Sequence, residues 1–191
     1  MTQSGPRRDR FVEVSGNPAP QGAQIVWFDG LEGRQLRACV APALSPAKPR
    51  GTVIVCPGRT EFIEKYFEVG RELQQMGFAI VILDWPGQGL SDRLLPDSRK
   101  GHIDRFETFM NALAKGLAAL DARLPRPYVS LAHSMGGAIA LAAITQELVK
   151  VEAAAFCAPM WGIKSPVLGM RYLVWAMRAT GRSGDYAMQP G

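Results

Sequence analysis

The chain is organised around the stretch Tyr128-Val129-Ser130-Leu131-Ala132-His133-Ser134-Met135-Gly136-Gly137. The stretch begins as a short apolar run with β-branched and aromatic members, which favours a β-strand. It then passes directly into Ser134, two glycines and a segment rich in Ala, Ile and Leu, which is typical of a helix. The sequence therefore predicts a strand that turns into a helix through a single serine.

A serine in such a turn has a specific chemical use. On a sharp, strained turn its hydroxyl stands clear of the sheet, as in the Gly-x-Ser-x-Gly nucleophile elbow of α/β-hydrolases. The positions two before and two after the serine must be small, and here they are Ala132 and Gly136. Gly137 eases the helix against the strand, and the helix N-terminus behind Ser134 favours a developing oxyanion. The alternative interpretation is a tight turn with an incidental serine.

A second motif, Cys56-Pro57-Gly58-Arg59, ends the strand before the first crossover helix. An α/β-hydrolase supplies its other oxyanion-hole amide from this position, and glycine lets the backbone approach the substrate closely. We therefore predict the backbone N–H groups of Arg59 and Met135 as the oxyanion donors. A simple Pro-Gly turn that ends a strand is the alternative interpretation.

The rest of the chain alternates between strand and helix patterns. Strands are predicted at about 24–28, 36–41, 52–56, 78–83, 128–133 and 151–157, and helices at about 62–76, 106–124, 135–149 and 166–180. Residues 1–22 are mostly polar and rich in Pro and Gly, so we expect a loose lead-in. Strands that alternate with helices imply an α/β fold with a mostly parallel sheet and flanking helices.

The composition narrows the class of protein and its partners. The 191 residues suit one domain or most of one, and 47% hydrophobic residues are enough for a core. The net charge of +5 is modest, and no basic stripe interleaved with aromatic residues is present, so we expect no nucleic acid partner. A weak attraction to anionic lipid head groups is left open.

The cysteines and the first residues bear on cofactors and localisation. Cys39, Cys56 and Cys157 lie in or beside apolar runs without metal-ligand spacing, so we expect three small buried side chains and no metal site among them. The serine chemistry expected at Ser134 implies no metal or organic cofactor. The first residues lack the apolar core of a signal peptide, and no apolar run is long enough to span a membrane. We expect a cytoplasmic protein, with peripheral membrane contact left open.

Taken together, the motifs resemble those of the lysophospholipase and monoacylglycerol lipase group of α/β-hydrolases, which is classified with serine aminopeptidase-like hydrolases. Within that group the chain is most similar to the bacterial lysophospholipases, over about residues 24–165. The resemblance rests on the motifs Cys56-Pro57-Gly58-Arg59 with Glu61 and Lys65-Tyr66, Gly77-Phe78, Asp84-Trp85-Pro86-Gly87-Gln88-Gly89 with Ser91, Gly101-His102 with Phe106, Ala132-His133-Ser134-Met135-Gly136-Gly137, and Ala158-Pro159-Met160 with Gly162-Ile163. It implies a serine hydrolase that acts on a lipid-like substrate, a carboxylic ester of glycerol or of a glycerophospholipid.

The chain departs from that group in its histidines. The fold places its catalytic triad in the order Ser, then Asp or Glu, then His. Here His102 and His133 both precede Ser134, and no histidine follows it. His133 adjoins the serine along the strand, so its side chain should point to a different face, and His102 resembles a family position outside the triad. The triad acid and base are therefore expected to be absent from this chain.

We interpret the chain as the N-terminal portion of a longer hydrolase. The resemblance implies a helical cap and two further strands that carry the acid and base. Residues 23–165 would form the N-terminal part of the core, and residues 166–191 the start of the cap, so the C-terminal strands and most of the cap would be missing.

The expected chemistry is ester hydrolysis by the complete protein. Ser134 would attack the carbonyl, the Arg59 and Met135 amides would hold the oxyanion, and a histidine outside this sequence would act as base. The 191 residues alone are expected to be inactive. Two alternatives remain open: a peptidase of the same fold, and a non-catalytic remnant or binding protein that lacks the base.

Overall fold

The computed structural model describes residues 9–30, 32–45, 48–162, 167–182 and 185. The chain divides into two compact units, Met1–Met160 and Trp161–Gly191. Each unit is described by itself.

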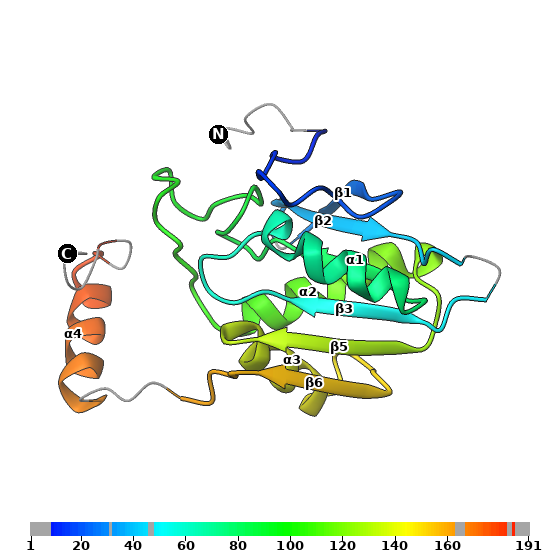
Figure 1. The fold of residues 1–191 in the computed structure, drawn as a ribbon. Coiled ribbons are helices and arrows are strands. Elements are labelled where there is room, and N and C mark those ends of the chain that lie inside the picture. The colour runs from blue at the N-terminus through cyan, green and yellow to red at the C-terminus, as the bar shows by residue number, and fades with distance from the viewer. Residues whose placement is uncertain (1–8, 31, 46–47, 163–166, 183–184, 186–191) are drawn as a thin grey trace. The chain divides into compact units, whose positions relative to one another are not determined.

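The first unit is built on a six-stranded sheet in the order β1-β2-β4-β3-β5-β6 (Figure 1). Its strands are β1 (Gln24–Asp29), β2 (Gln35–Ala41), β3 (Thr52–Cys56), β4 (Ala79–Leu83), β5 (Tyr128–His133) and β6 (Ala153–Cys157). The β1–β2 hairpin is antiparallel, and β2 pairs antiparallel with β4. The β4–β3, β3–β5 and β5–β6 pairs are parallel, which confirms the predicted mostly parallel sheet.

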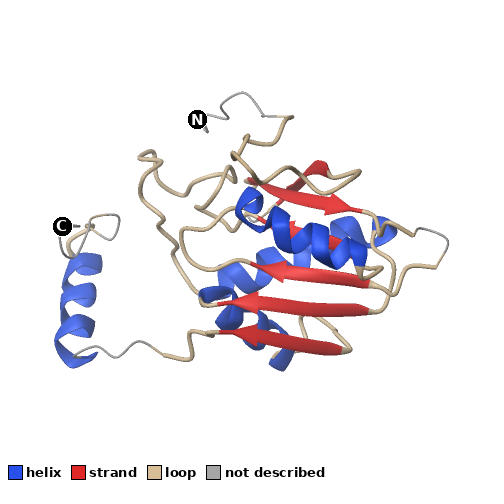
Figure 2. Ribbon diagram, in the orientation of Figure 1, coloured by secondary structure: helices blue, strands red, loops and turns tan. Residues whose placement is uncertain are grey.

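Helices cover both faces of this sheet (Figure 2). The 3₁₀ helix η1 (Ile63–Tyr66) and helix α1 (Phe67–Gln75) pack on one face, and α2 (Glu107–Leu120) and α3 (Met135–Thr145) pack on the other; the short η2 (Asp121–Arg123) follows α2. All five residues of β3 and of β4 are buried, because a parallel strand between two helical layers has no face in solvent.

The structure corrects the end of the elbow helix, which stops at Thr145 and not at Val149. Glu147 adopts a left-handed conformation with φ 57°, and its N–H donates to the Ile144 carbonyl. The next amide, from Leu148, donates to the Ala143 carbonyl, which completes a Schellman motif. Such a motif usually has glycine at the left-handed position, so glutamate there concealed the helix end from sequence analysis.

The expectation that all three cysteines are buried is wrong for Cys157. Cys39 and Cys56 are buried, whereas Cys157, the last residue of β6, is exposed. Among the described residues β6 pairs with β5 alone and forms an edge of the sheet, and most of its residues are exposed. The apolar run therefore predicted the strand correctly, but it did not predict whether the side chains of that strand are buried.

The ends of the described chain add two details. Phe11 packs edge-on against Phe67 with ring centroids 5.0 Å apart, so part of the N-terminal segment lies on the α1 face. In the second unit the predicted helix is present as α4 (Val167–Ala179), while Pro166 lies outside the described residues. Its assignment to a cap remains a prediction. Within the described residues, α4 and the other helices all lack the length and apolar character that a membrane crossing requires.

Candidate active site

Ser134 lies between β5 and α3 in a backbone conformation that is rare for a residue other than glycine, with φ 49° and ψ −119°. Such strain persists only where the surroundings fix it. The Ser134 N–H donates to the Cys157 carbonyl at 3.0 Å, and the Met160 N–H donates to the Ser134 carbonyl at 3.0 Å. The Ser134 side chain does not cap α3. Its hydroxyl is therefore presented on a fixed turn without being used to hold the helix.

Gly136 allows α3 to begin against the end of β3. A Cβ on Gly136 would lie 2.1 Å from the Cys56 carbonyl oxygen and 2.4 Å from that of Pro57. The nearest atoms thus belong to β3 and the residue after it, and not to Ala132, which is buried in the sheet opposite Cys56. A Cβ on Gly137 would lie 2.9 Å from the Cβ of Pro159. Both glycines are required by close packing of the elbow.

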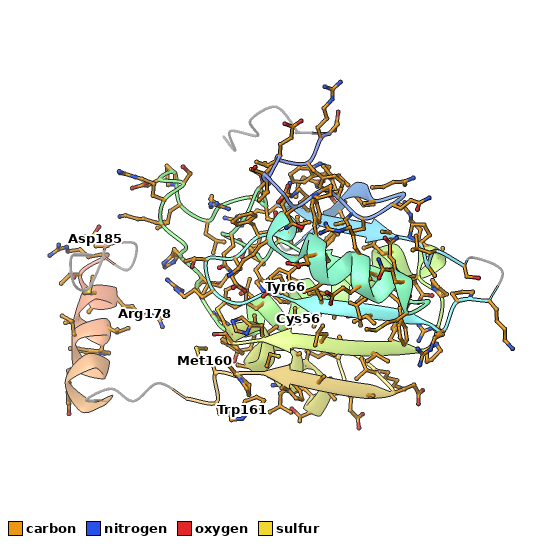
Figure 3. All side chains as sticks on the ribbon, in the orientation of Figure 1. Cys56, Tyr66, Met160, Trp161, Arg178 and Asp185 are labelled. Carbon is orange, nitrogen blue, oxygen red and sulfur yellow. The ribbon has the colours of Figure 1, made fainter. Side chains whose placement is uncertain are left out.

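The ends of β3 and β5 bring the two predicted motifs to the same edge of the sheet. The strands are parallel neighbours, and Cys56 pairs with Ala132. Figure 3 labels Cys56 at the end of β3 and Met160 beyond the end of β6, at that same edge. Residues 57–62, here called the β3 loop, therefore start beside the elbow.

The amides of the β3 loop and the elbow differ in their hydrogen bonds. The Gly58 N–H donates to Glu61 Oε2 at 2.5 Å, and the Thr60 N–H donates to Gln88 Oε1. Within the described residues, the Arg59 and Met135 N–H groups have no hydrogen-bond partner. Met135 is the first residue of α3, where helix geometry leaves amides unpaired. The two amides predicted as oxyanion donors are therefore free.

The two histidines occupy different places. A Cβ on Gly58 would lie 3.2 Å from His133 Cδ2, so the His133 side chain lies beside the β3 loop. Along β5 the side chains alternate between buried and half-buried, and His133 is half-buried. His102 lies in the segment between β4 and α2, where a Cβ on Gly87 would lie 3.1 Å from its carbonyl oxygen.

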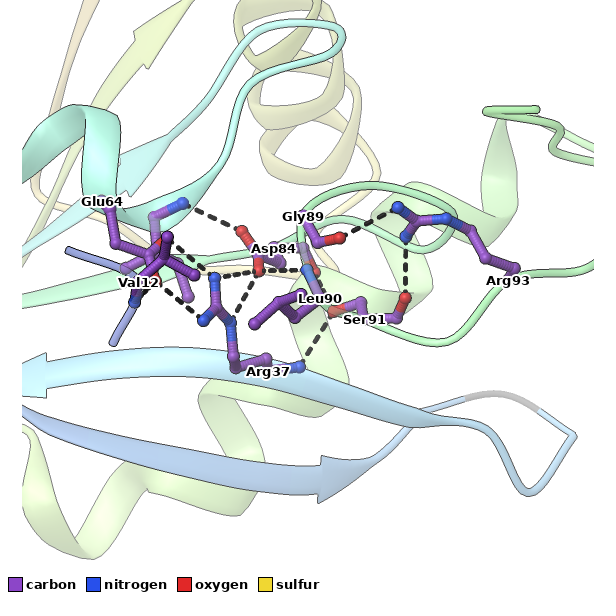
Figure 4. Close-up of polar contacts among 9 residues, drawn as sticks. Val12, Arg37, Glu64, Asp84, Gly89, Leu90, Ser91 and Arg93 are labelled. Carbon is purple, nitrogen blue, oxygen red and sulfur yellow. Dashed lines mark hydrogen bonds and ion pairs between the residues drawn. The ribbon is translucent and has the colours of Figure 1, made fainter. Parts of the chain in front are cut away.

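A buried ionic network, which sequence analysis missed, joins Arg37 of β2 to Glu64 and Asp84 (Figure 4). Arg37 of β2 bonds Glu64 of η1 through Nη1 and Nη2, both at 2.9 Å, and its Nε bonds Asp84 Oδ2 at 2.7 Å. Asp84 follows β4, and its carboxylate also accepts the N–H groups of Ile63 and Leu90, each at 2.9 Å. The network therefore ties the segment after the β3 loop and the segment after β4 to the sheet.

Backbone packing encloses the Asp84 carboxylate. A Cβ on Gly89 would lie 2.1 Å from Asp84 Cγ, so glycine is required where the loop closes over it. Ser91 Oγ donates to the Asp84 carbonyl at 2.7 Å and accepts the Arg37 N–H at 2.9 Å. A signal for this network was present in the sequence: Arg37 stands inside an apolar strand, and a charged side chain is rarely buried without a partner.

The pKa shifts follow from this burial and pairing. Burial raises the pKa of the Asp84 carboxyl, and the attraction of Arg37 opposes that rise. Burial alone would lower the pKa of Arg37, but its attraction to Asp84 and Glu64 raises it overall. Burial raises the pKa of Cys56 to about 12, so the thiol at the end of β3 stays protonated near neutral pH.

The Glu61 carboxylate lies beneath the β3 loop. Burial opposes its ionisation, but hydrogen bonds from Lys65, Tyr66 and Gly58 lower its pKa, so it is an anion near neutral pH. Burial, and then the hydrogen bond to Glu61, raise the pKa of Tyr66. In the part of the chain that the structure describes, no group of three or more His, Cys, Asp or Glu side chains is arranged so that it could hold a metal ion.

Comparison with known proteins agrees with the fold and the motifs. The chain is similar to lysophospholipase L2 of Escherichia coli (strain K12), with 41% identity over 112 residues, which are 58% of this chain and 33% of that protein. It is also similar to the probable lysophospholipase L2 of Haemophilus influenzae, with 28% identity over 145 residues, 74% of this chain and 45% of that protein. The chain thus spans less than half the length of these relatives.

A solved structure supports the fold. The crystal structure of a thermostable carboxyl esterase from Bacillus coagulans matches 86% of this chain and 52% of its own with a TM-score of 0.63 and 20% sequence identity. At that identity the match shows the α/β-hydrolase fold and nothing finer. The model of the family described as serine aminopeptidase, S33, matches residues 47–186. The chain therefore belongs to the serine aminopeptidase (S33) family of α/β-hydrolases.

Proposed function

We propose that the complete protein is a serine hydrolase of carboxylic esters and that Ser134 is its nucleophile. The observation that carries this proposal is the strained Ser134 turn together with the Arg59 and Met135 amides at the same edge of the sheet, which have no hydrogen-bond partner among the described residues. An oxyanion hole requires donors that are held in place and unpaired before the reaction, and these two amides meet that requirement.

The reaction follows from this arrangement. Ser134 Oγ attacks the ester carbonyl carbon while a general base takes its proton, and the Arg59 and Met135 N–H groups bind the oxyanion that forms. The base then protonates the leaving alcohol, an acyl-serine remains, and water releases the acid by the reverse sequence. The Gly58 amide is not a donor in this scheme, because Glu61 already accepts it.

The base is a histidine outside these 191 residues. No histidine follows Ser134 in the sequence, and His133 lies on the adjoining position of β5. Without an imidazole the serine hydroxyl stays protonated near neutral pH and is a poor nucleophile. Residues 1–191 alone should therefore lack enzymatic turnover, because loss of the base in a comparable serine hydrolase costs roughly 10⁶-fold in rate.

The proposed substrate is a lysophospholipid or a monoacylglycerol. The support is the 41% identity to a protein named lysophospholipase L2, in a stretch of 112 residues. The family description names an aminopeptidase, so peptide hydrolysis is the second candidate.

The test compares the complete gene product, its Ser134→Ala variant and residues 1–191. Each is assayed on lysophosphatidylcholine, monoacylglycerol and aminoacyl p-nitroanilides, and is treated with a fluorescent fluorophosphonate. We expect ester hydrolysis and labelling in the complete protein, and loss of both in Ser134→Ala with an unchanged circular dichroism spectrum. Wild-type turnover by Ser134→Ala would remove this serine from the mechanism, and faster cleavage of the anilides would favour the peptidase.

The short chain tests the assignment of the base. Turnover by residues 1–191 comparable to that of the complete protein, and lost on Ser134→Ala, would show that a base exists within it. His102 would then be the first residue to replace.

A further inference from the structure

Three successive amides of the β3 loop have three different environments. The N–H of Gly58 is taken by the Glu61 side chain, and the N–H of Thr60 is taken by the Gln88 side chain. The amide between them, from Arg59, has no partner among the residues that the structure describes. The pattern is selective, because both side chains reach the flanking amides and neither takes the central one.

The Glu61 side chain is largely buried and bonds to the β3 loop of which it is a part. Its side chain is only 10% exposed, and its Oε2 accepts both the Gly58 N–H and the Tyr66 hydroxyl. A Cβ on Gly58 would lie 2.8 Å from Glu61 Oε2, so the carboxylate sits directly against the Gly58 backbone. Lys65 adds an ion pair on the outer side, through Oε1. Glu61 is therefore held in the orientation that binds the Gly58 amide.

Gln88, in the segment after β4, binds the amide that follows Arg59. Gln88 is 7% exposed, and its Oε1 accepts the N–H of Thr60, a β-branched residue with φ 60°. That conformation is unfavourable for such a residue and needs an external constraint. In the same segment the Trp85 indole N–H donates to the Pro57 carbonyl at 2.8 Å. The segment after β4 thus holds the β3 loop on both sides of the Arg59 amide.

Packing alone does not explain the glutamine at this position. Gln88 Nε2 is buried and has no hydrogen-bond partner in the described structure. An unpaired buried donor is unfavourable, and an apolar side chain of similar size would avoid it. The acceptor on the same side chain is what the loop uses, since it is the partner of the Thr60 amide.

We propose that Glu61 and Gln88 are positioning residues of the oxyanion hole: by taking the amides on either side of Arg59, they leave the Arg59 N–H free and fix its direction. This inference rests on the proposed function. A donor contributes to the rate only if it is fixed before charge develops on the substrate oxygen. If Gly58 or Thr60 lost its acceptor, the loop could rotate its peptide planes, and the Arg59 amide would no longer be aligned.

The expected kinetic effect falls on the chemical step. The oxyanion exists in the transition state and not in the bound ester, so a misaligned donor lowers kcat and leaves KM nearly unchanged. Loss of a whole donor typically reduces the rate about 10²- to 10³-fold. A displaced donor should reduce kcat less, by roughly 10- to 100-fold.

The experiment uses the complete gene product with p-nitrophenyl butyrate as substrate and a fluorophosphonate as label for Ser134. Glu61→Met and Gln88→Met remove one acceptor each with little change in volume, and Glu61→Gln keeps an oxygen for the Gly58 amide. The matched control is Gln74→Met. Gln74 is also a buried glutamine, bound to the backbones of Gln21 and Pro42 at the far end of α1.

We expect kcat to fall in both methionine variants at unchanged KM, Glu61→Gln to recover most of the loss, and Gln74→Met to keep wild-type kcat even if its melting temperature drops. Wild-type kcat in correctly folded Glu61→Met and Gln88→Met would overturn the inference while the proposed function stands. A wild-type protein that neither reacts with the label nor hydrolyses the ester would overturn the proposed function and this inference with it. The two positions are tested independently, so a variant that fails to fold at one leaves the other to decide.

Discussion

Replacing Arg37 by methionine should strongly destabilise the protein near neutral pH. The guanidinium contacts two carboxylates that are almost completely removed from solvent, Glu64 at 1% and Asp84 at 0% side-chain exposure. Methionine fills a similar volume with no charge, so both carboxylates would stay buried without the cation that compensates them.

The size of the loss in unfolding free energy depends on the hydrogen bonds that the two carboxylates retain. Removal of one partner of a buried ion pair typically costs about 3–5 kcal/mol. Asp84 retains the N–H donors of Ile63 and Leu90, and Glu64 retains that of Val12. Both carboxylates lose the cation, but these remaining bonds keep the loss of unfolding free energy within that range. We therefore expect a loss of about 4 kcal/mol. That is a large part of a typical total stability of about 5–15 kcal/mol.

The loss should depend on pH in a defined direction. Burial raises the folded-state pKa of Asp84, and Arg37 limits the rise, so the variant should have a still higher folded-state pKa. A carboxyl with a folded-state pKa above the unfolded value stabilises the fold fully at low pH, and this contribution is lost as the pH rises through the folded-state pKa. The deficit of Arg37→Met should therefore be smaller at about pH 4.5 than at about pH 7.5.

The assay is urea unfolding followed by tryptophan fluorescence at several pH values, with free energies from linear extrapolation. The matched control is Arg34→Met on the same hairpin, because Arg34 pairs with Glu32 at 24% and 74% side-chain exposure. An exposed pair of this kind contributes under about 1 kcal/mol. A wild-type unfolding free energy for Arg37→Met at neutral pH, or a deficit that does not shrink in acid, would refute the reasoning.

Three further predictions concern the site and the sheet edge. Gly136→Ala should reduce ester hydrolysis at least about 10²-fold, because the new Cβ would lie 2.1 Å from the Cys56 carbonyl oxygen. The control Gly101→Ala should be tolerated, because the nearest atom to its Cβ would be 3.9 Å away. Equal rates for the two variants would contradict the packing argument. Arg59→Ala should keep kcat within a few-fold of wild type, because the backbone is the proposed donor, and a drop of about 10²-fold or more would assign a role to the side chain. Among the three cysteines of residues 1–191, Cys157 alone is exposed, so Ellman's reagent should titrate one thiol in folded residues 1–191 and three in urea. Rapid reaction of all three in the folded state would show that the other two are accessible.

The sequence predicted the elements that local patterns determine. The apolar runs of β3 and β4 could be placed because a strand buried on both faces needs an unbroken apolar sequence. The turn at Ser134 could be placed because few residue types fit a strand that enters a helix directly. The adjacency of the β3 loop and the elbow was expected from the place of the Pro-Gly motif in α/β-hydrolases, and the parallel pairing of β3 with β5 agrees with it.

What the sequence did not predict depends on partners far along the chain. Arg37 is 27 residues from Glu64 and 47 from Asp84, so no local pattern joins them. The positions of Glu61 and Gln88 around Arg59 depend likewise on a loop that folds back over another loop. The exposure of Cys157 depends on what lies beside β6, which an apolar strand pattern does not specify.

The Asp84 carboxylate also bears on how firmly the segments after the β3 loop and after β4 are held. Backbone amides in loops usually exchange with solvent quickly, because small local openings release them. The amides of Ile63 and Leu90 are different, since both donate to the buried Asp84 carboxylate, which is paired with Arg37. Because this acceptor is buried and held by Arg37, we expect both hydrogens to exchange more slowly than those of exposed loop amides. In hydrogen-exchange terms, we expect these two loop positions to be protected to a degree that is usual for strands and unusual for loops.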